Sequence, residues 1–221
     1  MNTPSPKYPR TFHLPWSPGG TSDDRRLASV EPLLCTDIVV TEKLDGSNVC
    51  IEADGCYARS HASAPNHPSF DAFKAFHAGV KSKLPEGLQV FGEWLYAKHS
   101  IGYSTLPGYF MAFGVRDLNK MTWASWAEVE LWAEELSVQT APVLAKESWL
   151  NREWKLRDLT ESLSRLPSCC GGEREGVVVR RADEFADKDF SVSVAKLVRA
   201  NHVQTEDHWK NQAIVRNLLG T

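Results

Sequence analysis

A series of short extended segments, separated by turns and beginning at Asp37, limits the folds open to this chain more than any other feature. The segment DIVVTEK at 37–43 is rich in β-branched residues, and NVCIEA at 48–53 follows it after a tight DGSN turn. GCYARS at 55–60 is typical of a third strand, so we expect a β-meander here. Further strands are predicted in LQVFGEWL, YFMAFGV, EGVVVRR and SVSVAKLV.

Three helices are predicted between and after these strands. Aromatic residues recur at helical spacing over 69–84, and a capping box from Ser125 to Glu128 opens a second helix. A third is expected over about 147–166. Strands and helices do not alternate regularly, which favours an α+β fold of largely antiparallel sheets flanked by helices.

The ends of the chain differ from this central part. Residues 1–36 are rich in Pro, Gly and Ser, and we expect an irregular arm packed on the domain. Within it, Trp16 is either a packed anchor or a stacking surface. Residues 37–221 are predicted to form one domain whose tail, from Thr205, is a short helix.

Bulk composition excludes several classes of protein. No apolar run approaches the ~20 residues of a membrane span, and the N-terminus lacks the apolar core of a secretion signal. We therefore expect a cytoplasmic protein with no membrane partner. The formal net charge of -3 is unlike a strongly basic nucleic-acid-binding domain, so any phosphate-binding surface must be local.

The segment TEKLDGSN at 41–48 carries the first candidate chemistry. On a strand, Thr41 and Lys43 share one face and Glu42 points to the other. A lysine facing the concave side of a sheet is costly to bury without a purpose. An exposed lysine before an ordinary hairpin would have the same pattern, and this segment alone does not separate the two interpretations.

Other charged residues lie within apolar strand segments. Arg59 lies in YARS and Glu93 in FGEW. Glu175 heads the run EGVVVRR, and Lys196 lies in SVAKLVR. These residues either form separate salt bridges or converge on one pocket, and convergence explains all of them at once.

The ordered motifs EKLDGSN, YARS, FGEW, YFMAFG, EGVVVR and AKLVR resemble those of the covalent nucleotidyltransferases, which comprise ATP-dependent ligases and mRNA capping enzymes. The form EKxxGSN is similar to the RNA ligase 2-like branch, because Asn48 stands where capping enzymes and DNA ligases usually have arginine. The motifs extend from Glu42 to Arg199. The resemblance implies a single nucleotidyltransferase (adenylyltransferase) domain that uses ATP and Mg²⁺.

The resemblance also implies which residues handle the phosphates. Lys43 would attack the α-phosphorus of ATP and become a lysyl-AMP, Arg59 would bind phosphate, and Lys196 would hold the α-phosphate. Glu175 would assist the metal-dependent step, although the metal ligands themselves stay undetermined. Because a protonated lysine cannot attack, we expect burial, Lys196, Arg59 and Mg²⁺ to lower the pKa of Lys43.

A second set of residues would recognise the nucleoside. Glu42 and Asn48 would contact the nucleotide, Glu93 would bind the ribose hydroxyls, and Phe113 would stack on adenine. The alternative for Phe113 is a core residue of its strand.

The chain departs from the resembled pattern after these motifs. Relatives usually have two basic residues two positions apart, but Val198 stands two after Lys196, so either Lys196 acts alone or Arg199 bends back. Gly114 stands where an acidic residue often follows the stacking Phe. The stretch after Lys196 is too short for an OB-fold or other C-terminal domain, so a partner protein is one way in which sealing could be supported.

Three functions remain open at this point. The first is an ATP-dependent RNA ligase that transfers AMP to a 5′-phosphate and seals it to a 3′-hydroxyl, with RNA preferred and nicked duplex among the candidate acceptors. The second is a GTP-using capping-type nucleotidyltransferase, and the third a non-catalytic nucleotide- or RNA-binding module. Candidate nucleic-acid contacts are Arg174, Arg180, Arg181, Arg199 and Lys210.

Overall fold

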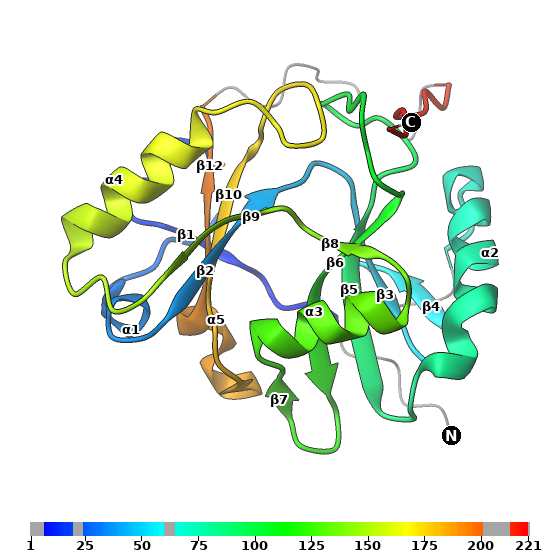
Figure 1. Cartoon of the computed structure of the whole chain (residues 1–221), viewed down its shortest axis with the longest axis horizontal. Helices are drawn as coiled ribbons and strands as arrows, with labels where there is room; N and C mark the ends of the chain where they lie inside the picture. Colours follow the sequence, from blue (N-terminus) through cyan, green and yellow to red (C-terminus); the bar gives the residue numbers. More distant parts are fainter. Residues whose placement is uncertain (1–6, 20–23, 60–64, 201–212, 221) are drawn as a thin grey trace.

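Two β-sheets face each other in the computed structural model, which describes residues 7–19, 24–59, 65–200 and 213–220 (Figure 1). A cavity lies between the sheets, and both contribute side chains to it. Helices cover the outer faces, so the chain is α+β and its sheets are largely antiparallel, as predicted.

The first sheet has five strands in the order β1 (Phe12–His13), β12 (Val194–Val198), β10 (Gly176–Arg181), β2 (Ile38–Lys43) and β9 (Val143–Glu147). Only β1 and β12 pair in parallel; the other neighbours are antiparallel. In this register Gly176 lies opposite Lys43, and Val178 lies opposite Lys196. The two lysines therefore reach the inner face from strands on either side of β10.

The second sheet has seven strands. In order they are β11 (Phe185–Ala186), β7 (Thr122–Trp123), β6 (Phe110–Asp117), β5 (Leu88–Trp94), β3 (Ser47–Ile51) and β4 (Cys56–Ala58), with β8 (Gln139–Thr140) pairing in parallel with β6. Asn48 lies opposite Glu93 in the β3–β5 pair, so both side chains belong to the same face.

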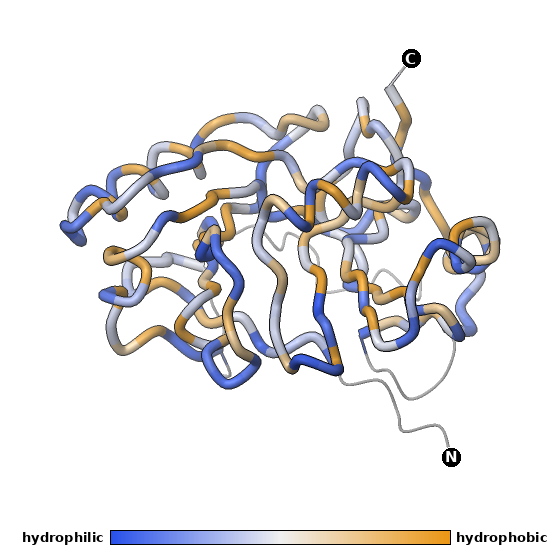
Figure 2. The backbone as a smooth tube through the Cα atoms, turned by 60° about the horizontal axis from the view of Figure 1, so that its bottom comes forward, coloured by the Kyte–Doolittle hydropathy of each residue, from blue (hydrophilic) through white to orange (hydrophobic). Residues whose placement is uncertain are grey.

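In the described part of the chain, five α-helices flank the sheets: α1 (Glu31–Leu34), α2 (Asp71–Val80), α3 (Trp126–Glu135), α4 (Glu153–Ser164) and α5 (Phe190–Ser193). Short 3₁₀ turns occupy Pro68–Phe70, Lys81–Lys83 and Asp187–Asp189. Helix α4 packs on the outer face of the five-stranded sheet, and α2 and α3 pack on that of the seven-stranded sheet. Figure 2 shows hydrophobic stretches along the packed elements and hydrophilic residues at many of the turns.

Helix α3 illustrates how local signals and packing agree. Ser125 and Glu128 form the predicted capping box, which satisfies amide groups at the helix start. Trp126 and Val129 are then buried against strands β5 and β6. Each such fully buried apolar side chain stabilises the fold by roughly 1.5–3 kcal/mol.

The predicted meander over 37–60 is wrong in one respect. Strands β3 and β4 pair as expected, but β2 belongs to the other sheet, so the turn between β2 and β3 joins two sheets instead of closing a hairpin. The glycine of this turn is required by space and not by a left-handed backbone. A Cβ at Gly46 would lie 2.7 Å from the carbonyl oxygen of Trp94.

One further boundary differs from expectation. The helix predicted over 147–166 begins only at Glu153, because Val143–Glu147 forms strand β9 against β2. Between them, Trp149 and Asn151 have φ angles of 47° and 49°, a left-handed conformation that interrupts a helix.

The N-terminal arm packs on the domain, and its described part includes β1 and α1. The Trp16 indole donates a hydrogen bond to Thr160 of α4 at 3.1 Å, so Trp16 is a packed anchor. The tail helix predicted from Thr205 falls mainly on residues 201–212, outside the described residues. Residues 213–220 are not helical and form bridges with the loop after β5.

Within the described ranges, every helix is too short or too polar to cross a lipid bilayer.

Candidate active site

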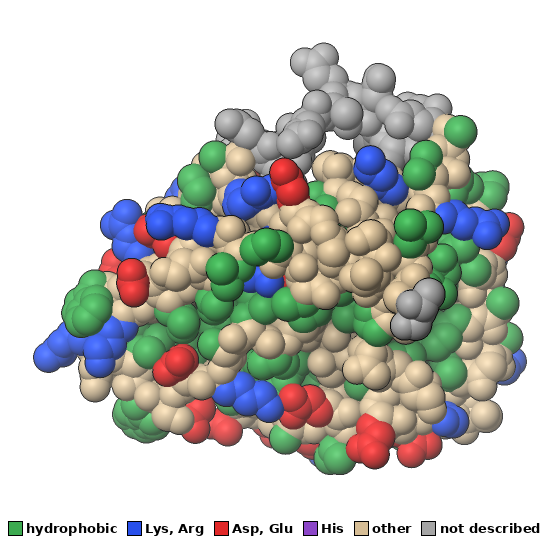
Figure 3. Space-filling view, turned by 45° about the horizontal axis from the view of Figure 1, so that its top comes forward, with side chains coloured by type: hydrophobic (Ala, Val, Ile, Leu, Met, Phe, Trp, Pro, Cys, Tyr) green, Lys and Arg blue, Asp and Glu red, His purple; other side chains and the backbone are tan. Residues whose placement is uncertain are grey.

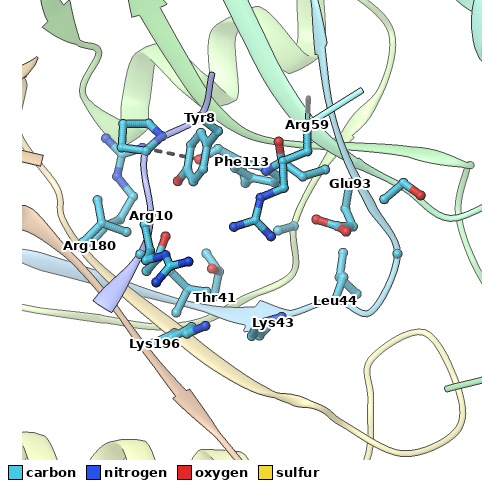
Figure 4. A pocket seen from close by; sticks show the side chains of 18 of the residues that line it. Tyr8, Arg10, Thr41, Lys43, Leu44, Arg59, Glu93, Phe113, Arg180 and Lys196 are labelled. Atoms are coloured by element: carbon cyan, nitrogen blue, oxygen red, sulfur yellow. Dashed lines mark hydrogen bonds between the residues drawn. The ribbon is translucent and has the colours of Figure 1, made fainter. Parts of the chain in front are cut away.

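The central cavity has a volume of about 630 Å³ and is lined by both sheets and the N-terminal arm (Figure 4). Most of the residues singled out from the sequence line it: Glu42, Lys43, Asn48, Arg59, Glu93, Phe113 and Lys196. Glu175 reaches it through its contact with Lys43. The interpretation that these side chains converge on one pocket is therefore confirmed, and the alternative of separate salt bridges is not.

Lys43, the last residue of β2, is held by Glu175 at the start of β10. Its ammonium nitrogen lies 2.7 Å from both carboxylate oxygens, and the two side chains are 25% and 5% exposed. Gly176, the next residue, permits the close approach of β10 to β12, because a Cβ there would lie 1.9 Å from the carbonyl oxygen of Leu197. The pair is a charge-assisted contact at the centre of the site.

The expected lowering of the Lys43 pKa is wrong for this structure. Burial does favour the neutral amine, but the carboxylates of Glu175, Glu93 and Asp45 outweigh it, so the pKa of Lys43 is raised. In this state the amine is a bound ammonium. Attack on an electrophile requires that the proton leave and that the ion pair loosen.

Glu93 faces the same space from β5. Burial raises its pKa to about 8, against the opposing effect of Lys43, and the nearby Glu175 and Asp45 add to the rise. The amide of Gly46 donates a hydrogen bond to this carboxyl group and so acts in the other direction. Glu93 is therefore largely protonated at neutral pH and can donate as well as accept a hydrogen bond.

Asn48 lies opposite Glu93 and lines the cavity. Its side-chain carbonyl oxygen is buried and has no hydrogen-bond partner among the residues the structure describes. Buried polar atoms are normally satisfied, so this oxygen is suited to a donor supplied by a ligand.

Lys196 enters the cavity from β12. It lies 3.4 Å from Asp24 of the N-terminal arm, and Asp24 is also 3.4 Å from His13. Burial and then the charge of Lys43 lower the pKa of Lys196, and Asp24 opposes them. Arg199 instead contacts Glu173 at 2.7 Å and is absent from the cavity lining, so Lys196 is the cation that the last motif brings to the site.

Phe113 combines the two interpretations left open for it. It lines the cavity from β6, yet it also packs on the buried aromatic cluster between the sheets, with the Tyr8 ring 5.2 Å away. Asp117, further along β6, accepts hydrogen bonds from the amides of Asn119 and Lys120 and so belongs to a turn.

Glu42 lies in β2 next to Lys43, but its carboxylate is held elsewhere. It accepts a hydrogen bond from the Cys169 amide at 2.8 Å and lies 3.4 Å from Arg174. The strand alternation predicted from the sequence accounts for this, since Glu42 and Lys43 project to opposite faces. Its second oxygen is buried without a hydrogen-bond partner in the described part of the chain.

Two of the proposed nucleic-acid contacts are wrong because they are buried. Arg174 pairs with Glu42, and Arg180 donates to the carbonyl oxygens of Phe113 and Ala124. Lys210 lies outside the described residues. On the face drawn in Figure 3, positive and negative side chains are interspersed, as the net charge suggests.

The sequence did not predict two contributions to the site. These are the cavity-lining residues of the N-terminal arm and the loop after β5, which supports the β2–β3 turn. Tyr8, Arg10 and Asp24 line the cavity, although a Pro- and Gly-rich arm carries no periodic signal that would predict this. In the loop after β5, the Tyr103 hydroxyl accepts a hydrogen bond from the Asp45 amide at 2.8 Å. The Ile101 amide donates to the Asp45 carboxylate at 2.7 Å.

Comparison with known proteins agrees with this arrangement. The family model described as RNA ligase matches residues 36–198, which cover all the strands that carry the predicted site residues. The chain belongs to the RNA ligase family. A sequence comparison with curated proteins finds no significant match.

Several solved structures of an RNA ligase from Naegleria gruberi share the fold. A variant with ATP and Mn superposes with a TM-score of 0.61 at 19% identity, covering 94% of this chain and 60% of that chain. A variant with AMP and Mn gives 0.59 at 17% identity, covering 92% and 59%. This chain therefore spans about three fifths of the length of these ligases.

Proposed function

We propose that this chain is an ATP-dependent RNA ligase that forms a lysyl-AMP at Lys43, transfers the AMP to a 5′-phosphate and seals that end to a 3′-hydroxyl. One observation carries the proposal. Lys43, Glu93, Glu175 and Lys196 come from both sheets and surround one cavity in a chain of the RNA ligase family. Ligases of the same fold were solved with ATP and Mn.

In the first step, the Lys43 nitrogen attacks the α-phosphorus of ATP. A phosphorus–nitrogen bond forms, and the bond from that phosphorus to the bridging oxygen breaks, so that pyrophosphate leaves with the electron pair. Glu175, 2.7 Å from the amine, is within reach to accept the proton that Lys43 must lose. The carboxylates raise the pKa of Lys43 in this structure. A divalent cation bound with the nucleotide would act against them.

Lys196 and Arg59 would supply fixed positive charge for the phosphates. Positioning and electrostatic stabilisation account for most of the catalysis of such transfers, because charge moves between oxygen atoms as the bonds exchange. Lys196 is suited to the α-phosphate, since it lines the same cavity as Lys43, from the strand on the other side of β10.

The carboxylates fit a divalent cation that enters with the nucleotide. The described residues contain no cluster of three or more His, Cys, Asp or Glu that could hold a metal alone. Mg²⁺ commonly takes only one or two protein carboxylates beside phosphate oxygens and water. Glu175, beside Lys43, would provide one such carboxylate, and the bound ion would neutralise phosphate charge.

The seven-stranded sheet would recognise the nucleoside. Glu93 is placed for the ribose hydroxyls, and the open carbonyl oxygen of Asn48 for a donor on the nucleotide. Phe113 offers a ring face to adenine, a contact worth about 1–3 kcal/mol per base in proteins that stack bases. Glu42 would act from behind β2, through its second oxygen or by fixing the strand.

The proposed acceptor is RNA, with nicked duplex among the candidates. A partner protein is proposed as one further source of the contacts that sealing requires.

Incubation with α-labelled ATP and Mg²⁺, followed by 5′-phosphorylated RNA, tests the proposal. We expect a labelled protein, then labelled RNA with a 5′-adenylate, and then a joined strand when a 3′-hydroxyl is offered on a complementary template. Lys43→Met should abolish all three products, and labelled GTP should give none. Label that reaches the protein but no nucleic acid would refute the ligase function, and an unlabelled wild-type protein would refute the whole proposal.

A further inference from the structure

The N-terminal arm contributes one wall of the cavity although it lies outside the family match. The match begins at residue 36, whereas the cavity lining includes Tyr8, Pro9, Arg10, Thr11 and Asp24. Residues that line a ligand cavity are candidates for a binding role.

Tyr8 anchors the arm before it reaches the cavity. Its ring is partly buried, with centroids 5.1–5.3 Å from those of four other aromatic rings, Phe91, Phe113, Trp123 and Phe190. Three of the four contacts are close to perpendicular, the arrangement that aromatic pairs favour. The ring joins both sheets, since Phe91 and Phe113 belong to the seven-stranded sheet and Phe190 to the helix before β12.

A second anchor follows Arg10. Strand β1 pairs in parallel with β12 and places His13 opposite Lys196. The Leu14 amide donates to the Lys196 carbonyl oxygen at 2.8 Å, and Asp24 contacts the Lys196 ammonium. Arg10 is therefore held between two fixed points, within three residues of each, beside the strand that carries Lys196.

Figure 4 shows the guanidinium groups of Arg10 and Arg59 and the ammonium groups of Lys43 and Lys196 around the same space. A triphosphate carries more negative charge than one lysine can balance. Arginine is well suited to this task, because its planar fork can bind two phosphate oxygens at once.

We propose that Arg10 is a phosphate-binding residue of this site, presented by the Tyr8 anchor. The inference rests on the proposed function for the identity of its ligand. That ligand is a phosphate group, either the terminal phosphates of the nucleotide, which leave as pyrophosphate, or the 5′-phosphate of the RNA end.

Calorimetric titration tests this without requiring catalysis. Inorganic pyrophosphate with Mg²⁺ is one probe, and an RNA oligonucleotide with a 5′-phosphate, compared with its 5′-hydroxyl form, is the other. In Arg10→Ala we expect the Kd for one probe to rise about 10- to 100-fold, as for loss of a charge-assisted hydrogen bond. Arg10→Lys should recover part of this loss, because the charge remains without the fork.

Arg25→Ala is the matched control, since Arg25 is an exposed arginine of the same arm and does not line the cavity. Its affinities should equal those of the wild type. A loss confined to pyrophosphate assigns Arg10 to the nucleotide, and a loss confined to the 5′-phosphate assigns it to the RNA. Unchanged affinity of Arg10→Ala for both probes, or equal losses in Arg25→Ala, would overturn the inference even if Lys43 becomes adenylated.

Discussion

The two walls of the cavity differ in what they offer a ligand. The five-stranded sheet presents Lys43 and Lys196, with Glu175 at the start of β10. The seven-stranded sheet presents Asn48, Glu93 and Phe113, which are a neutral amide, a carboxyl group with a raised pKa and an aromatic ring. Under the proposed function, the first wall would act on the phosphates. The second would recognise the nucleoside, apart from Arg59, which directly follows β4 and would bind phosphate.

This difference predicts that substitutions on the two walls affect different kinetic constants. Losses on the charged wall should reduce the rate of self-adenylation, because fixed cations act on charge that develops in the transition state. Losses on the opposite wall should chiefly weaken binding, since a base or ribose makes the same contacts before and during the reaction. The turn at Leu44, Asp45 and Gly46 connects the walls and should affect their alignment.

The largest effect is expected for Lys196→Ala on the charged wall. Removal of a single stabilising group at a developing charge typically costs about 10²–10³ in rate, so self-adenylation at saturating ATP should fall by that factor. Single-turnover labelling measures it. Arg199→Ala is the control, because Arg199 contacts Glu173 and should leave the rate unchanged. A normal maximal rate with a raised ATP KM in Lys196→Ala would remove the distinction between the walls.

Phe113→Ala removes an aromatic ring from the seven-stranded side of the cavity, and its effect on the reaction should be smaller than that of Lys196→Ala. Loss of a stacking surface worth about 1–3 kcal/mol corresponds to a rise of roughly 5- to 150-fold in the KM for ATP, with little change in the maximal rate. Phe76→Ala is a matched control, because Phe76 stacks on Phe110 and packs on the outer core. It should lower thermal stability and leave the KM unchanged. A loss of maximal rate alone in Phe113→Ala would contradict the assignment.

Tyr103→Phe tests the junction of the two walls. The phenol oxygen of Tyr103 accepts a hydrogen bond from the Asp45 amide. Removal of this oxygen leaves the amide donor unsatisfied, at a cost of about 1–3 kcal/mol. If Tyr103 positions the turn, the adenylation rate should fall about 10-fold with an unchanged KM for ATP. Tyr109→Phe, which removes a hydrogen bond to the Asn217 carbonyl oxygen, should not change the rate. Equal effects of both substitutions would make Tyr103 a purely structural residue.

The last prediction is a pH-dependent gain in stability from Glu93→Gln. The pKa of Glu93 is about 8 in the folded chain and ~4.3 in an unfolded one, so between these values the folded state holds a proton that the unfolded state has released. Folding stability therefore decreases as pH rises through this window. Glutamine does not titrate and should avoid that loss.

Thermal melts at pH 5 and 8.5 measure the difference. The Tm advantage of Glu93→Gln over the wild type should be larger at pH 8.5 than at pH 5, by roughly 2–4 °C for each kcal/mol. Glu86→Gln, on the loop before β5, is the control and should show no such trend. A Tm difference that does not depend on pH would mean that Glu93 is charged in the folded state throughout.

Local pattern was sufficient for much of the fold. Alternation predicted that Thr41 and Lys43 share a face opposite Glu42, and the capping box at Ser125 marked the start of α3. These features depend on neighbours in the sequence, which is why they could be inferred. The convergence of Lys43, Glu93 and Lys196 was inferred in a different way, since charged residues inside apolar strands need partners.

Features set by long-range packing were missed. The DG turn suggested a hairpin, but Gly46 is needed for its close approach to β5, and β2 pairs with β10 and β9. The sequence predicts that the pKa of Lys43 falls, because burial and the positive charges of Lys196, Arg59 and Mg²⁺ would disfavour the ammonium form. In space its nearest neighbours are carboxylates, above all Glu175. The arm residues likewise gain their meaning only from contacts with distant strands.

The most direct test is to find the atom that becomes attached to AMP. The protein is incubated with ATP and Mg²⁺, digested, and mapped by tandem mass spectrometry, with Glu175→Gln run in parallel. The account predicts one adenylyl group on the side chain of Lys43, formed more slowly when Glu175 cannot accept a proton. An adenylyl group on any other residue, or an adduct that persists in Lys43→Met, would contradict it.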